Sequence, residues 1–75
     1  MEFILVHVKE DPTAHAAVLI NGELNGVTGQ LITLGSPGWV FISVDLPNAR
    51  QQNVNVKNTT ARHPMTIVVE QESDD

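Results

Sequence analysis

The segment from Trp39 to Leu46 constrains the fold of this chain more than any other part of the sequence. Every second position in it carries an aliphatic side chain: Val40, Ile42, Val44 and Leu46. Because side chains alternate between the two faces of a strand, these four must share one face, which a small domain cannot leave in water. The other face begins with aromatic residues and ends with Ser43 and Asp45. We therefore predict a half-buried strand whose aliphatic face forms the centre of the core.

Short apolar segments recur along the chain between turn residues. They cover residues 2–8, 15–21, 24–34, 39–46, 51–58 and 65–70. Gly26 and Gly29 interrupt the third segment, which indicates a bulge or a corner where the chain passes between sheets. Such spacing predicts an all-β fold, a small sandwich of about six short, mostly antiparallel strands. We expect it to form a single domain over residues 1–70.

Asn21-Gly22 is the strongest turn signal in the sequence. Both residues tolerate positive φ, as a two-residue hairpin loop requires. This turn predicts that Leu19 lies opposite Leu24, so that the two side chains form a cross-strand pair. Together with two residues of the last strand they are expected to pack against the aliphatic face of the strand at 39–46; the four are Leu19, Leu24, Ile67 and Val69.

An ordered series of motifs runs through residues 16–56. They are Ala17 to Gly22, Gly26-Val27-Thr28, Leu31 to Leu34, Pro37-Gly38 and Trp39 to Val44. This order resembles the PEGA domain, a β-sandwich family of bacteria and archaea. Gly29 stands where the family pattern has proline, and Leu46-Pro47-Asn48 stands where a Gly-Tyr turn is often found. The resemblance implies a binding or adaptor domain without catalysis, and it assigns no ligand and no functional residue.

The formal net charge of −5 is concentrated at the end of the chain. Residues 1–69 have four basic and five acidic side chains, a balance of −1, and the remaining acids are Glu70, Glu72, Asp74 and Asp75. We therefore predict an acidic, frayed tail at residues 71–75. With no basic patch, no apolar run of membrane-spanning length and no signal peptide, we expect a soluble, cytoplasmic protein without nucleic-acid binding or membrane insertion.

The sequence holds no recognisable set of catalytic residues. It has no cysteine, no serine in a nucleophile elbow and no carboxylate pair in an apolar setting. Gly35-Ser36-Pro37-Gly38 lacks the Gly-Lys-Ser/Thr ending of a phosphate loop, so it is expected to be a turn. His7, His15 and His63 could ligate a metal only if the first two strands pair with each other. We predict ordinary edge or loop histidines, and neither an enzyme, a cofactor nor a metal site.

Trp39 has two alternative roles. Beside Phe41 it could anchor a sugar or a peptide, or it could cap one end of the core in a domain with three aromatic residues. The capping role is the one we expect. The predicted function is a non-catalytic interaction domain with a protein partner as one candidate ligand and no assigned binding residues. The alternative is a structural subunit of a homo-oligomer, assembled through strand edges or the Trp39 face.

Overall fold

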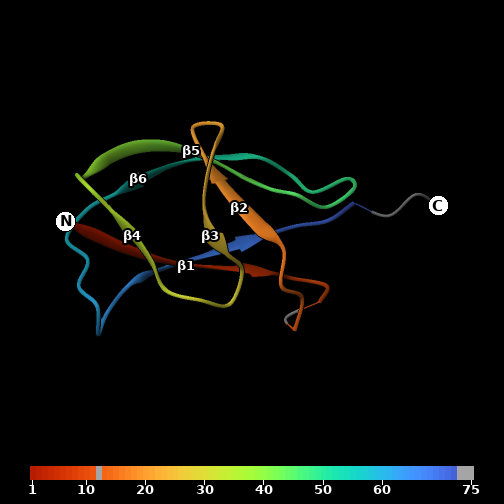
Figure 1. The fold of residues 1–75 in the computed structure, drawn as a ribbon, viewed down its shortest axis with the longest axis horizontal. Coiled ribbons are helices and arrows are strands. Elements are labelled where there is room, and N and C mark those ends of the chain that lie inside the picture. Colours follow the sequence, from red (N-terminus) through yellow and green to blue (C-terminus); the bar gives the residue numbers. More distant parts are fainter. Residues whose placement is uncertain (12, 73–75) are drawn as a thin grey trace.

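A computed structural model describes residues 1–11 and 13–72, in which seven strands form two sheets packed face to face (Figure 1). The strands are β1 Glu2–Val8, β2 Ala17–Ile20, β3 Glu23–Val27, β4 Ile32–Leu34, β5 Gly38–Val44, β6 Gln52–Val56 and β7 Met65–Val69. One sheet has the order β3-β2-β5-β6 and the other β4-β1-β7. The predicted all-β sandwich is confirmed.

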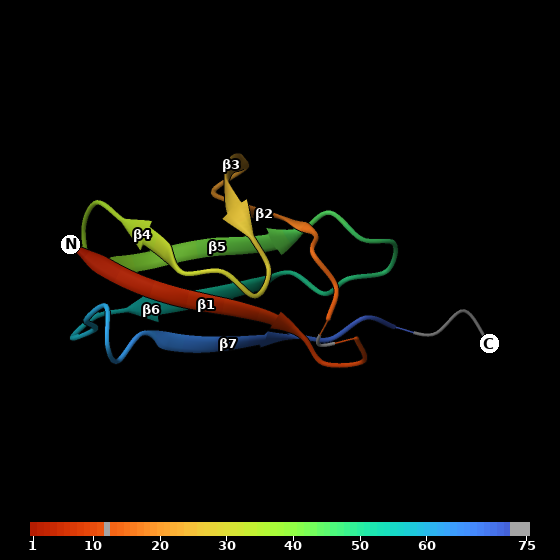
Figure 2. The same cartoon turned by 60° about the horizontal axis from the view of Figure 1, so that its bottom comes forward.

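The segment at residues 24–34 forms two strands in different sheets, which is why the structure has more strands than expected. The chain leaves β3, turns a corner and enters β4 (Figure 2). Gly26 allows this because a Cβ there would lie 2.7 Å from Cγ1 of Ile32. Thr28 is only 1% exposed. Its hydroxyl donates to the carbonyl of Ala14 at 2.7 Å and accepts from the N–H of Ala16 at 3.0 Å.

The first and last strands lie side by side and run parallel, from Ile4 opposite Met65 to Val8 opposite Val69 (Figure 1). All the other strand pairs among the described residues are antiparallel. The expectation of mostly antiparallel strands is therefore confirmed. Because β1 also pairs with β4, it forms the centre of the three-stranded sheet.

The hairpin between β2 and β3 forms at the predicted turn. Asn21 and Gly22 have φ values of 53° and 85°, as a loop of this kind requires. Leu19 lies opposite Leu24, in the predicted register.

The prediction that Leu19 and Leu24 pack against the core is wrong. Their pair lies on the outer face of the sheet, where Leu24 is 72% exposed. Val18 and Ile20 fill the inner face of β2 instead. Alternation along β2 then places the side chain of Leu19 on the opposite face.

The core lies between the two sheets and is almost entirely aliphatic. Ile42 and Val44 are buried as predicted, with Val40 and Leu46 partly buried at its margin. Ile67 and Val69 of β7 are also buried, as expected. The remaining buried hydrophobic residues are Ile4, Val6, Val8, Ala16, Val18, Ile20, Ile32, Leu34 and Val56.

The hydrogen-bonded part of the chain extends beyond the predicted domain boundary at residue 70. Gln71 forms an isolated antiparallel bridge with Ala49, and the N–H of Glu72 donates to the carbonyl of Asn48 at 2.9 Å. Residues 71 and 72 are therefore attached to the domain. Residues 73–75 of the predicted tail lie outside the described residues.

Candidate binding surface

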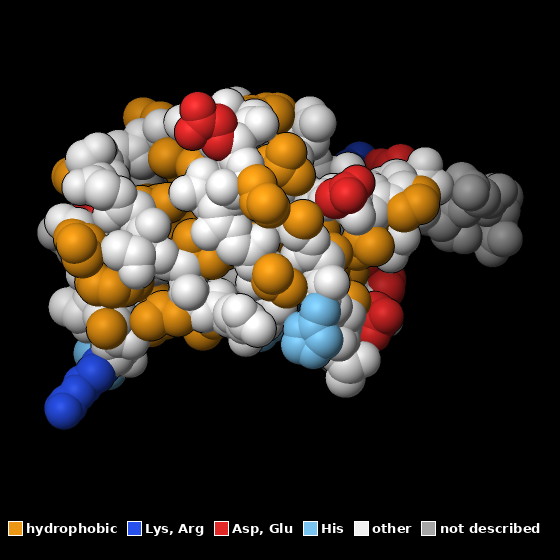
Figure 3. All heavy atoms as spheres, viewed as in Figure 1, with side chains coloured by type: hydrophobic (Ala, Val, Ile, Leu, Met, Phe, Trp, Pro, Cys, Tyr) orange, Lys and Arg blue, Asp and Glu red, His pale blue; other side chains and the backbone are white. Residues whose placement is uncertain are grey.

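The outer face of the four-stranded sheet is the candidate binding surface. Alternation along its strands places nine side chains there: Leu24, Val27, Ala17, Leu19, Trp39, Phe41, Ser43, Asn53 and Asn55. None of the nine carries a formal charge, and six are apolar. We call this set the uncharged face. On the side of the molecule that Figure 3 shows, hydrophobic side chains reach the surface at several places among uncharged polar ones.

Trp39 lies on the uncharged face and is 71% exposed. The expectation that it caps one end of the core is therefore wrong. Val40 points inward from β5, so its neighbour Trp39 must point outward, and no described element covers it. Phe41, two residues further along the strand, is 37% exposed on the same face. Two of the three aromatic side chains in the chain thus project from one strand.

The hairpin turn fixes the backbone beside these aromatic side chains. The N–H of Asn21 donates to the carbonyl of Phe41 at 2.8 Å. The side-chain oxygen Oδ1 of Asn21 accepts from the N–H of Phe41 at 2.9 Å. Asn21 therefore extends the pairing of β2 with β5 by one residue and holds Phe41 in an ordered strand.

The cross-strand partners of the two aromatic residues are amides. Trp39 lies opposite Asn55, and Phe41 lies opposite Asn53. Asn53 and Asn55 alternate with Val54 and Val56 in the sequence, so their sharing one face of the strand can be predicted from the sequence. The sequence does not indicate that this face adjoins Trp39 and Phe41, because alternation within one strand carries no information about its neighbour in the sheet.

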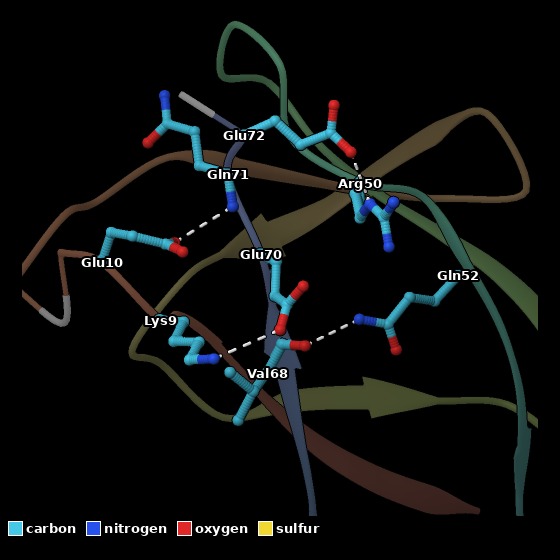
Figure 4. A network of polar contacts seen from close by, with 8 residues as sticks. All are labelled: Lys9, Glu10, Arg50, Gln52, Val68, Glu70, Gln71 and Glu72. Carbon is cyan, nitrogen blue, oxygen red and sulfur yellow. Dashed lines mark hydrogen bonds and ion pairs between the residues drawn. The ribbon is translucent and has the colours of Figure 1, made fainter. Parts of the chain in front are cut away.

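A groove of about 390 Å³ lies on another side of the molecule, between the edge strands β6 and β7. Its lining residues include Lys9, Arg50, Gln52, Val68 and Glu70. Figure 4 shows the polar contacts there: Lys9 Nζ lies 3.3 Å from a carboxylate oxygen of Glu70, and Gln52 donates to the carbonyl of Val68 at 2.7 Å. Gln52 thereby bridges the two sheets where no strand joins them.

Hydrogen bonds also connect the start of β1 to the loop that follows β6. Glu2 accepts from the N–H of Thr59 at 2.9 Å and from its hydroxyl at 2.7 Å. The hydroxyl of Thr59 in turn accepts from the N–H of Phe3 at 2.7 Å. The two bonds from Thr59 stabilise the ionised carboxylate and lower the pKa of Glu2 below its ordinary value of 4.5.

The three histidines do not come together. β1 pairs with β4 and β7 and not with β2, so His7 lies opposite Val68 on β7. His15 lies in the connection before β2, and His63 lies in the loop before β7. The described residues contain no group of three potential metal ligands.

Comparison with known proteins yields no match to a family model, to a curated protein or to a solved structure. Within residues 1–11 and 13–72, no helix could cross a membrane.

Proposed function

We propose that this chain is a non-catalytic interaction domain of the PEGA-like type, which contacts a partner protein through the uncharged face. The exposure of Trp39 is the observation that carries this proposal. The centres of protein interfaces are enriched in aromatic residues and depleted in charged ones. An exposed apolar patch is a common mark of such a site.

The distribution of charge over the domain supports the choice of this face. Most charged side chains lie in loops or beyond strand ends, such as Glu10, Asp11, Asp45, Lys57 and Arg62. A face of nine uncharged residues in a chain that is 17% charged is therefore suited to a partner surface that is itself apolar and uncharged.

The PEGA-like type rests on the residues that carry the resemblance. Asn21-Gly22 forms the hairpin, and Gly26 to Thr28 forms the corner between the sheets. These two motifs thus coincide with backbone features on which the sandwich depends.

The first experiment identifies the partner. A photo-crosslinking phenylalanine analogue replaces Leu24, which is 72% exposed on the uncharged face, or Val68, which is 46% exposed on the other sheet. We expect one cellular protein to be crosslinked from position 24 and not from position 68. Crosslinking from position 68 alone would contradict the assignment of the face. If position 24 crosslinks only to a second copy of the chain, the face mediates self-association, and the proposal of a partner protein is contradicted.

The second experiment titrates the purified partner against the domain. Trp39 is the only tryptophan and the chain has no tyrosine, so its fluorescence reports on this surface alone. We expect its emission to shift to shorter wavelength as the partner excludes water. Trp39→Ala, followed by calorimetry, should weaken binding roughly 30-fold, or about 2 kcal/mol, as for a central aromatic anchor. The control Thr33→Ala, on the exposed face of β4 in the other sheet, should change the affinity little. Equal affinities for wild type and Trp39→Ala would contradict the proposal.

A further inference from the structure

The free edge of β6 exposes a defined set of backbone groups. Both backbone groups of Phe41 bond to Asn21, on the β2 side of β5. Even-numbered residues of β5 therefore bond to β6, where Val40 pairs with Val54 and Ile42 with Gln52. It follows that the N–H and C=O groups of Asn53 and Asn55 point away from the sheet.

This edge lacks the features that usually prevent strand pairing. Edge strands are commonly protected by charged residues, proline or bulges. β6 has the sequence Gln-Asn-Val-Asn-Val, with no charge, no proline and no shift of register against β5. Nothing in the described part of the chain hydrogen-bonds the outward backbone groups of Asn53 and Asn55.

The edge of β7, on the same side of the sandwich as β6, is partly occupied. The carbonyl of Val68 accepts from Gln52 at 2.7 Å, and that of Glu70 accepts from the N–H of Arg50 at 2.8 Å. The contrast between the two edges places an incoming strand on β6 and not on β7.

We propose that the chain forms a two-fold symmetric dimer in which β6 pairs antiparallel with β6 of a second copy. The symmetry axis passes through Val54, so that Asn53 lies opposite Asn55 of the second copy. Each such pair then exchanges both N–H···O bonds, as hydrogen-bonded antiparallel pairs do. The dimer has a continuous sheet made of two four-stranded sheets.

Charge supports a second copy as the occupant. In this register Val54 lies opposite its own equivalent, and the amides of Asn53 and Asn55 lie opposite each other. Beyond the strand, Lys57 lies opposite Gln51, and the backbone of Arg50 is bonded to Glu70 of its own chain. No like charges meet, although like charges directly opposite each other would oppose pairing. This dimer does not depend on the proposed function, because it leaves the uncharged face of each copy open.

Disulfide trapping tests the register, since the chain has no cysteine of its own. In the proposed dimer the Cα atoms of residues 53 and 55 from the two copies are about 5.5 Å apart, within disulfide range. Residue 53 is roughly 8 Å from its own equivalent, which is too far. A mixture of Asn53→Cys and Asn55→Cys should therefore form the mixed disulfide in large excess over either symmetric one. Random pairing would give the mixed disulfide about twice the yield of each symmetric one, so a mixed product no more abundant than that would overturn the proposal.

Sedimentation equilibrium tests the dimer itself. We expect a reversible, concentration-dependent approach to twice the 8.2 kDa mass of the chain. Asn53→Pro removes an outward N–H that the sheet does not use, and should raise the dissociation constant at least about tenfold. Circular dichroism melting checks that this variant still folds.

The matched control is Thr66→Pro on the open edge of β7. The N–H of Lys9 donates to the carbonyl of Val69, so odd-numbered residues of β7 face β1 and the N–H of Thr66 points away from the sheet. This variant should dimerise like the wild type. A monomer at every concentration, or a dimer weakened by Thr66→Pro and not by Asn53→Pro, would overturn the proposal.

Discussion

The two sides of the sandwich are joined in different ways. On the β3–β4 side the chain itself passes from one sheet to the other. There the buried hydroxyl of Thr28 forms hydrogen bonds with the backbone of Ala14 and Ala16. On the β6–β7 side no strand crosses. The sheets are connected there by Gln52, by the exposed ion pair of Arg50 with Glu72 and by the backbone hydrogen bond from Arg50 to Glu70. Buried polar contacts are costly to break, whereas exposed ones contribute little. We therefore expect substitutions on the two sides to differ greatly in effect.

The largest effect is expected at Thr28. Thr28→Val keeps the shape but leaves the N–H of Ala16 and the carbonyl of Ala14 without a partner. Because each unsatisfied buried group costs about 1–3 kcal/mol, we expect a loss of about 2–4 kcal/mol in the free energy of unfolding, measured with urea. Thr33→Val, on the exposed face of β4, should be nearly neutral. Similar losses for Thr28→Val and Thr33→Val would contradict the stabilising role assigned to the buried hydrogen bonds of Thr28.

Gly26 should be the next most sensitive position. In Gly26→Ala the new Cβ would lie 2.7 Å from Cγ1 of the buried Ile32, which must move. Overpacking of this kind costs about 1–3 kcal/mol. Gly35→Ala, where a Cβ meets nothing within 4 Å, serves as the control in the same urea experiment. A neutral Gly26→Ala would show that the corner is not tightly packed.

On the open side, Gln52→Leu should have a smaller effect. It frees the carbonyl of Val68, which has the β6–β7 groove beside it. We expect a loss of about 0.5–1.5 kcal/mol, the net value of one hydrogen bond. Gln51→Leu, exposed one residue earlier, should leave the urea midpoint unchanged. A loss as large as that of Thr28→Val would mean that both sides are held equally firmly.

Acid should weaken the contact between Glu2 and Thr59. The folded state lowers the pKa of Glu2, so its contribution to stability is complete above the ordinary pKa of 4.5 and disappears as the pH falls through the folded value. Glu2→Gln should therefore be less stable than the wild type at neutral pH, with the difference shrinking in acid. A difference independent of pH would contradict the role given to the ionised carboxylate.

The smallest effect is expected at Arg50. Its Nε lies 2.7 Å from a carboxylate oxygen of Glu72, but both side chains are more than half exposed. Arg50→Ala should cost less than about 1 kcal/mol, and salt should reduce even that difference. A larger, salt-independent loss would indicate that the side chain of Arg50 contributes more to stability than this exposed ion pair.

Much of the fold could be predicted from the alternation of apolar and polar residues along the strands. The predictions failed where this alternation is absent. The strand at 39–46 was placed correctly because its two faces differ in chemistry. In β2, by contrast, Val18, Leu19 and Ile20 are all aliphatic, so the sequence cannot show which of them face the core. The corner at Gly26 and the hairpin at Asn21-Gly22 were signalled by residues with special backbone requirements.

The candidate binding surface could be predicted less completely from the sequence than the fold. The inward face assigned to Val40 already required Trp39 to point outward, but the sequence does not show whether another element covers that face. The cross-strand neighbour of Trp39, Asn55, comes from a distant part of the chain, and such pairing is decided by tertiary packing. The parallel pairing of β1 with β7 could not be predicted from the sequence either, since no local motif indicates it.

That parallel ladder has a consequence for biosynthesis. β1 is made first and β7 last, and the central strand of the smaller sheet lacks one neighbour until the final strand is available. The domain therefore cannot complete its core while the C-terminal strand remains inside the ribosome. Contacts at such sequence separation also slow folding. We expect nascent chains stalled before residue 65 to be digested readily by protease, and full-length chains released from the ribosome to become resistant.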